Sequence, residues 1–162
     1  MNYCKIESCS IAAGKGCAVS LFVSGCEHHC RGCFQPETWN FNYGKEFTEQ
    51  TVQCIIELAK PDYISHLAIF GGEPMHPRNR TDVLALVKKF KEAYPEKTVW
   101  LWTGYLWEDL ASDLVDSGID VVVDGRFVEE LKDLRLKYRG SSNQRVIDVR
   151  ASLKDNNITL YE

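Results

Sequence analysis

The sequence contains no apolar run that approaches the length of a membrane-spanning helix, and its first residues lack the charged region and apolar segment of a secretory leader. It also has no excess of basic residues, since its formal net charge is -4 at pH 7. An acidic balance argues against broad binding to nucleic acids or membrane surfaces. We therefore expect a cytoplasmic protein with neither nucleic acid nor membrane as a partner.

The cysteines lack the pattern of a disulfide framework. There are seven of them, an odd number, and no secretory leader accompanies them. We expect Cys4 and Cys9 to be small buried residues or exposed thiols, and Cys54 to be structural. The expected compartment is a reducing one.

The chain also lacks internal repeats, low-complexity segments and linkers. Its 162 residues, of which 44% are hydrophobic and 26% charged, are typical of a globular protein, so residues 1–162 are expected to form one domain. The Gly14-Lys15-Gly16 sequence is not a phosphate loop, because the G-x4-G-K-[ST] spacing is absent. We interpret residues 12–16 as a turn before the first strand.

Three thiols follow the apolar run Val19–Val23, which predicts a buried strand. Cys26, Cys30 and Cys33 have C-x3-C-x2-C spacing, which lets one loop curl around a single metal centre. Thiolates are soft ligands, so zinc and an iron–sulfur cluster are the candidates. A closed zinc site or an ordinary four-iron cluster needs four ligands, and the loop supplies three.

Two sources of a fourth ligand stay open. A thiol could come from Cys4, Cys9 or Cys17, or one of the two histidines inside the loop, His28 or His29, could complete a Cys3His zinc site. The reading that we favour is a [4Fe–4S] cluster with one iron left open for a substrate.

Strand and helix patterns alternate along the rest of the chain. Helical periodicity predicts a helix between Thr48 and Pro61, a second containing residues 83–90 and a third over residues 107–116. The strands expected beside them are residues 19–23, 64–70, 98–102 and 119–123. Such alternation predicts an α/β fold of parallel strands, with ligands bound at their carboxyl ends. Too few residues remain for eight βα units, so we expect an incomplete, laterally open (β/α) barrel.

The cysteine loop after the first strand and Gly71-Gly72-Glu73-Pro74 after the second together resemble the radical S-adenosylmethionine superfamily. Further stretches are similar to one family within it, the glycyl-radical activases that act on anaerobic ribonucleoside-triphosphate reductase. These stretches are residues 21–26, 30–34, 102–105, 123–127 and 139–145, and the last is the most family-specific.

The resemblance implies a fold of the radical S-adenosylmethionine type and a set of site residues. Cys26, Cys30 and Cys33 would bind three irons of a [4Fe–4S] cluster, and the open iron would chelate S-adenosylmethionine. Gly71, Gly72, Glu73 and Pro74 would receive the methionyl ammonium group, since glycines allow close approach and a carboxylate compensates the cation. The remaining contacts expected for S-adenosylmethionine are Phe34, Thr103 and Asp124, and no catalytic residue is assigned.

The resemblance also implies an activity and partners. One electron from an external donor such as flavodoxin would cleave S-adenosylmethionine and release a 5′-deoxyadenosyl radical. That radical would take a hydrogen atom from a backbone glycine of the large subunit of the anaerobic ribonucleoside-triphosphate reductase. Alternatives within the class are a pyruvate formate-lyase activase and a small-molecule radical enzyme. Outside the class, the alternatives are a zinc-stabilised adaptor and an iron–sulfur electron carrier.

Several residues keep two interpretations at this stage. Asp124 is expected either to lie near a bound cation or to cap the next turn. Residues 141–143 are expected either to contact a partner or to form a hydrogen-bonded turn. His28 and His29 either tune the cluster through hydrogen bonds or lie at the surface.

Overall fold

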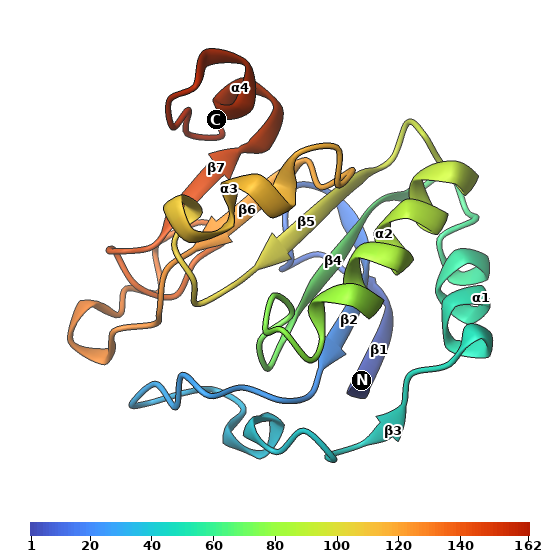
Figure 1. Ribbon diagram of the computed structural model, residues 1–162, viewed down its shortest axis with the longest axis horizontal. Coiled ribbons are helices and arrows are strands. Elements are labelled where there is room, and N and C mark those ends of the chain that lie inside the picture. The colour runs from blue at the N-terminus through green and yellow to red at the C-terminus, as the bar shows by residue number, and fades with distance from the viewer.

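The structure is a computed structural model that describes residues 1–162, and it is built on one seven-stranded sheet. The strand order is β3-β1-β2-β4-β5-β6-β7 (Figure 1). In chain order the strands are β1 (Asn2–Ser10), β2 (Cys17–Val23), β3 (Lys45–Glu46), β4 (Ile64–Gly71), β5 (Thr98–Trp102), β6 (Val121–Asp124) and β7 (Arg145–Asp148). The four central strands, β2, β4, β5 and β6, pair in parallel, and they are the four that the sequence predicts. The other three strands, β1, β3 and β7, pair antiparallel and were not predicted.

The helices are α1 (Glu49–Leu58), α2 (Arg80–Ala93), α3 (Trp107–Leu114) and α4 (Val149–Asp155), with short 3-10 turns η1 (Pro36–Trp39) and η2 (Glu129–Leu131). The predicted start of α1 is confirmed, because Thr48 and Thr51 form a reciprocal capping box there. The third helix ends at Leu114, two residues before the predicted Asp116. No helix in the structure has the length and apolar character needed to cross a bilayer.

The two faces of the sheet differ in what covers them. Helices α1, α2 and α3 lie on one side (Figure 1), and their apolar residues join alternate strand residues such as Leu21, Ile69 and Leu101 in the main core. The other face has small residues, Ala18 and Ala68, and large aromatic ones, and neither apolar cluster on that face contains a helix residue. A sheet whose second face is left to loops can hold a ligand there. We keep the incomplete, laterally open barrel as a proposal for the shape of this sheet.

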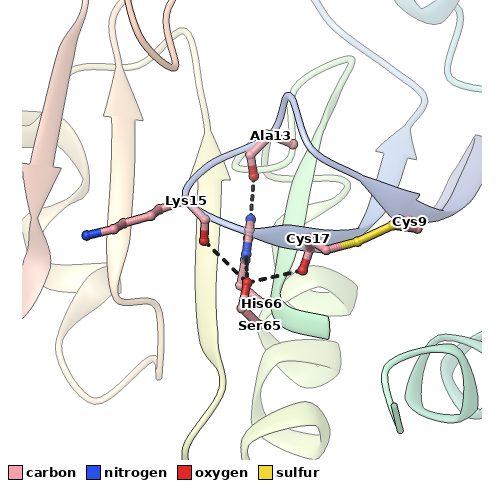
Figure 2. The surroundings of a disulfide bond; sticks show 6 residues. All are labelled: Cys9, Ala13, Lys15, Cys17, Ser65 and His66. Carbon is pink, nitrogen blue, oxygen red and sulfur yellow. Dashed lines mark hydrogen bonds between the residues drawn. A yellow bond between two sulfur atoms is a disulfide. The ribbon is translucent and has the colours of Figure 1, made fainter. Parts of the chain in front are cut away.

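One expectation about the cysteines is wrong. Cys9, near the end of β1, and Cys17, the first residue of β2, form a disulfide, so neither is a thiol (Figure 2). The pairing follows from the antiparallel hairpin, in which Ser10 lies opposite Ala18 and brings the two cysteines together. The residues of β1 are polar and half-exposed and show no clear strand pattern. The hairpin of β1 and β2, and with it the disulfide, could therefore not be predicted from the sequence.

The loop between these cysteines is the predicted turn, and a buried histidine holds it. His66 donates from Nε2 to the carbonyl oxygen of Ala13, and its Nδ1 lies 2.8 Å from Ser65 Oγ (Figure 2). Burial lowers the pKa of His66, which keeps the ring neutral at pH 7. Gly14 has φ +107° and a Cβ there would lie 2.7 Å from the His66 ring, so the loop requires glycine.

Candidate functional site

A cavity of about 660 Å³ opens where β2, β4 and β5 end. Its walls include all three motif cysteines, which were predicted to bind a cluster, and five of the seven residues predicted to contact S-adenosylmethionine. These residues are Cys26, Cys30, Cys33, Phe34, Gly71, Gly72, Glu73 and Thr103. Pro74 and Asp124 are not part of the cavity wall. Four loops that the sequence places after separate strands therefore contribute to one cavity, with Gly125 and Arg126 coming from the end of β6.

The cysteine loop is anchored at its first residues. Gly25 N–H donates to the carbonyl oxygen of Thr38 at 2.7 Å, and Cys26 N–H donates to that of Trp39 at 3.2 Å. Gly25 has φ +101°, and any side chain there would overlap the ring of Phe41. The segment that follows the motif thus folds back and fixes the position of Cys26.

All three motif cysteines line the cavity. Burial raises the pKa of the Cys26 and Cys30 thiols, and the backbone N–H groups of His28 and His29 oppose this shift at Cys26. No three histidine, cysteine or acidic side chains lie close enough together to hold a single metal ion. Three thiolates can each bind a separate iron of a four-iron cluster, whereas a closed zinc site needs four ligands on one ion.

The alternatives for a fourth ligand lose their support in this geometry. Cys4 does not line the cavity, and Cys9 and Cys17 are paired with each other. The histidines inside the loop also have other neighbours. His28 contacts Glu73, and His29 stacks on Trp39 with 4.5 Å between ring centroids.

The turn after β4 packs directly on the end of β2. Gly72 N–H donates to the carbonyl oxygen of Val23 at 2.7 Å, and Glu73 N–H donates to that of Gly25 at 2.9 Å. A Cβ on Gly71 would lie 2.6 Å from the Val23 backbone, and one on Gly72 would lie 2.7 Å from the Gly25 oxygen. Both glycines are therefore required for the close approach of the two strand ends.

Glu73 is only 1% exposed, and its carboxylate has four hydrogen-bonding neighbours. One oxygen accepts from the Thr103 hydroxyl at 2.6 Å and from Met75 N–H at 2.9 Å. The other accepts from Gly104 N–H at 2.7 Å and lies 2.8 Å from His28 Nε2. Two carboxylate oxygens offer about four lone-pair positions, so these contacts use all of them. The negative charge remains without a lysine or arginine partner.

Asp124 is completely buried, and its contacts point away from the cavity. It accepts from Trp107 N–H, the first residue of α3, at 2.8 Å and from Arg145 Nε at 3.0 Å. Arg145 also reaches Glu108, and the two carboxylates raise the pKa of its guanidinium. Asp124 therefore caps the start of α3, a helix that precedes it in the chain, and not the turn that follows it.

The segment between β6 and β7 closes one side of the cavity. Gln144, for which the sequence predicted no individual role, holds this segment together. Its amide oxygen accepts from Gly140 N–H at 2.9 Å and Ser141 N–H at 3.1 Å, and its NH2 donates to the Gly125 carbonyl oxygen at 3.0 Å. Asn143 donates to the Arg126 carbonyl oxygen at 2.8 Å. Ser141 and Asn143 thus form a hydrogen-bonded turn, and the polar run before β7 is the signal that marks it.

The same segment contacts the cysteine loop. Arg31 lies 3.1 Å from Glu129, and the Phe34 ring packs on Phe127 at 5.4 Å between centroids. In Figure 1 the cysteine loop, light blue, and the β6–β7 segment, orange, extend to the same side of the sheet. Phe34 lines the cavity and is also 65% exposed, so it stands at the mouth.

Comparisons with known proteins show the family of the chain. The family model described as a 4Fe-4S single cluster domain matches residues 12–147. The anaerobic ribonucleoside-triphosphate reductase-activating protein of Enterobacteria phage T4 is 42% identical over 146 residues, which cover 90% of this chain and 93% of that protein. The protein of the same name from Escherichia coli K12 is 42% identical over 154 residues, 93% of this chain and 100% of its own. The one from Vibrio cholerae is 40% identical over 148 residues, 89% and 96% of the two chains. No solved structure matches the chain.

Proposed function

Because the chain belongs to the family of anaerobic ribonucleoside-triphosphate reductase-activating proteins and contains a 4Fe-4S single cluster domain, we propose that it is a radical S-adenosylmethionine enzyme. Its product is a glycyl radical on the anaerobic reductase. Cys26, Cys30 and Cys33 hold the cluster, and the turn at Gly71–Glu73 receives the methionyl end of S-adenosylmethionine.

The observation that carries the proposal is one cavity shared by the three thiols and the Gly71–Glu73 turn. A cluster carrier or a structural zinc module has no use for a second, glycine-lined wall beside its ligands. The turn brings a carboxylate without a lysine or arginine partner to the cavity, and this charge attracts the methionyl ammonium group. Contact with the ammonium falls to backbone carbonyl groups of the turn, since the Glu73 lone pairs are already used.

The bound groups supply the chemistry, in which one electron from the cluster breaks the C5′–S bond and leaves methionine and a 5′-deoxyadenosyl radical. The protein binds and orients these groups and keeps water away. Phe22, Phe70 and Trp102 form an apolar wall of the cavity, and their aromatic ring C–H bonds are poor donors of a hydrogen atom to a radical. A glycine Cα–H that enters the cavity gives its hydrogen atom to the adenosyl carbon.

A polypeptide substrate agrees with the mouth of the cavity. Phe34, Leu131 and Leu134 are large apolar side chains exposed on the two loops that border it. A large protein that inserts a glycine between these loops must rest on this rim, which we define as Phe34, Leu131 and Leu134. The expected partners are the large subunit of the reductase and an external electron donor such as flavodoxin. We further propose that the reaction takes place in the cytoplasm.

Isotope transfer tests the proposed function. Reductase containing deuterated glycine is incubated with the reconstituted protein, S-adenosylmethionine and a chemical reductant. We expect a glycine-centred electron-spin signal and deuterium in the 5′-deoxyadenosine, with about one product molecule per radical. Reductase with unlabelled glycine is the control. A reductase that stays free of radical while 5′-deoxyadenosine takes its hydrogen from a small molecule would contradict the proposal.

A further inference from the structure

His28 connects the two halves of the site. It lies between the cluster ligands Cys26 and Cys30, yet its side chain points to the turn after β4, where Nε2 lies 2.8 Å from Glu73 Oε2. The two side chains are 8% and 1% exposed, so the contact is shielded from water. A hydrogen bond between a buried carboxylate and a ring nitrogen is stronger than one at the surface.

The surroundings leave the His28 ring little freedom. It packs edge-on against Tyr105, with 4.8 Å between ring centroids. Gly104 lies against the ring on another side, where any side chain would overlap it. Gly104 also donates its N–H to the same Glu73 oxygen that His28 contacts. One carboxylate therefore joins the cysteine loop, the turn after β4 and the turn after β5.

The first part of the cysteine loop does not depend on this contact. Gly72 and Glu73 bond to Val23 and Gly25 through their backbones, and Asn79 Nδ2 donates to the Ser24 carbonyl oxygen at 3.0 Å. These bonds hold the loop up to Gly25. Beyond Cys26, the His28 side chain makes the buried contact with Glu73, while the other tie to the segment after β4, from Glu27 to His76 at 3.2 Å, involves a carboxylate that is 72% exposed.

We infer that His28 is a positioning residue: through Glu73 it fixes the cysteine loop relative to the Gly71–Glu73 turn, and so sets the cluster at the correct separation from S-adenosylmethionine. The inference rests on the proposed function, because it requires both groups in the cavity. It assigns His28 no contact with either group. A ligand that bridges both parts of the site binds best when their separation is set before it arrives.

The test replaces the ring nitrogen and keeps the ring. His28→Phe retains the packing on Tyr105 and Gly104 and removes the hydrogen bond to Glu73, whereas His28→Gln retains a side-chain donor. His29→Asn is the matched control, because His29 lies in the same loop without a carboxylate partner, and asparagine tolerates its φ of +48°. Three quantities are measured on reconstituted protein without reductase: iron and sulfide content, the Kd for S-adenosylmethionine, and the spin spectrum of the reduced cluster with and without S-adenosylmethionine.

We expect His28→Phe to keep its iron and to bind S-adenosylmethionine about 10-fold more weakly, the effect of losing one hydrogen bond to a charged group. His28→Gln should recover part of this loss, and His29→Asn should match the unchanged protein. If the two residues act as a unit, His28→Phe combined with Glu73→Gln will bind no more weakly than the weaker single variant.

Three results would overturn the inference. The first is an unchanged affinity in His28→Phe, and the second is additive losses in the double variant. The third is loss of iron together with affinity, because His28 would then be part of the structure that binds the cluster. These results are distinct from a failure of the proposed function. In that case the unchanged protein itself would not bind S-adenosylmethionine, or its cluster spectrum would not respond to it.

Discussion

Glu73 and Asp124 both lie at the carboxyl ends of parallel strands, and both are buried acids that the sequence predicts as contacts for S-adenosylmethionine, but the structure surrounds them differently. Glu73 lines the cavity, and its hydrogen-bonding neighbours are two backbone N–H groups, a hydroxyl and a histidine ring. Asp124 is paired with Arg145 and lies outside the cavity wall. A motif at a strand end thus predicts which edge of the sheet a carboxylate occupies. Whether its charge is available to a cationic ligand depends on which partners the tertiary structure brings to it.

The largest effect is expected in the cavity that Glu73 lines, because the cluster there depends on three thiols. Replacing Cys26, Cys30 or Cys33 with alanine should abolish iron binding, because two thiolates cannot hold a cluster that already has one open iron. Iron and sulfide content after anaerobic reconstitution is the measurement. Cys54→Ala, on the exposed side of α1, is the control and should retain its iron. Loss of iron in the Cys54 variant would refute the assignment of three ligands.

Glu73→Gln tests whether this carboxylate, which has no lysine or arginine partner, attracts the ligand. The change removes the charge and keeps the shape, so iron content should persist while S-adenosylmethionine binding weakens. Glu73 acts on the ammonium through its charge, and two opposite unit charges a few ångströms apart attract each other by about 1–4 kcal/mol, so we expect the Kd to rise roughly 10- to 100-fold. Equilibrium dialysis with labelled S-adenosylmethionine measures it. An unchanged Kd would show that Glu73 plays no part in binding the cofactor.

Asp124→Asn is the matched amide substitution at the other acid, and we expect it to lower stability and to leave S-adenosylmethionine affinity unchanged. It leaves an acceptor for Trp107 N–H and deprives Arg145 of its buried partner, while Glu108 still contacts the guanidinium. We expect the free energy of unfolding to fall by about 2 kcal/mol, and the Kd for S-adenosylmethionine to stay the same in the folded protein. Urea denaturation and dialysis give the two values. If affinity falls as much as it does in Glu73→Gln, the distinction between the two acids is wrong.

The sequence predicted the parts of the fold that depend on local patterns. Continuous apolar runs predicted the four central strands, which are buried on both faces, and helical periodicity predicted the helices between them. β1 was not predicted, because its residues are half-exposed and polar, and the Cys9–Cys17 disulfide was not predicted with it. β7 is short and gains its strand geometry from pairing with β6.

In the site, too, the sequence predicted the features that depend on local motifs. Motif spacing placed the cysteines and the Gly71–Glu73 turn on one edge of the sheet, and all of them line the cavity. The contacts between His28 and Glu73 and between Asp124 and Arg145 join residues 45 and 21 positions apart, and no local pattern encodes them. Gln144 was missed for a related reason, since its amide bonds to backbone groups that meet only when the β6–β7 segment folds.

The smallest effect is expected at the rim, which contains neither Glu73 nor Asp124. Leu134 is 86% exposed beside the mouth, so Leu134→Ser should leave stability, iron content and S-adenosylmethionine affinity unchanged. If the reductase rests there, radical formation at limiting reductase should fall about fivefold, equivalent to about 1 kcal/mol of docking energy. Tyr63→Ser is the control, because Tyr63 is also exposed but lies just before β4, at the end away from the cavity. Equal radical yields from both variants would place the docking surface elsewhere.

The most direct measurement of the central claim is the electron-spin spectrum of the reduced, reconstituted protein before and after S-adenosylmethionine labelled with 15N at its amino group is added. If the cavity holds the cluster and the methionyl group side by side, the spectrum will change, and a hyperfine coupling to the labelled nitrogen will appear. A spectrum identical with and without S-adenosylmethionine, in protein that contains its full complement of iron, would contradict the account.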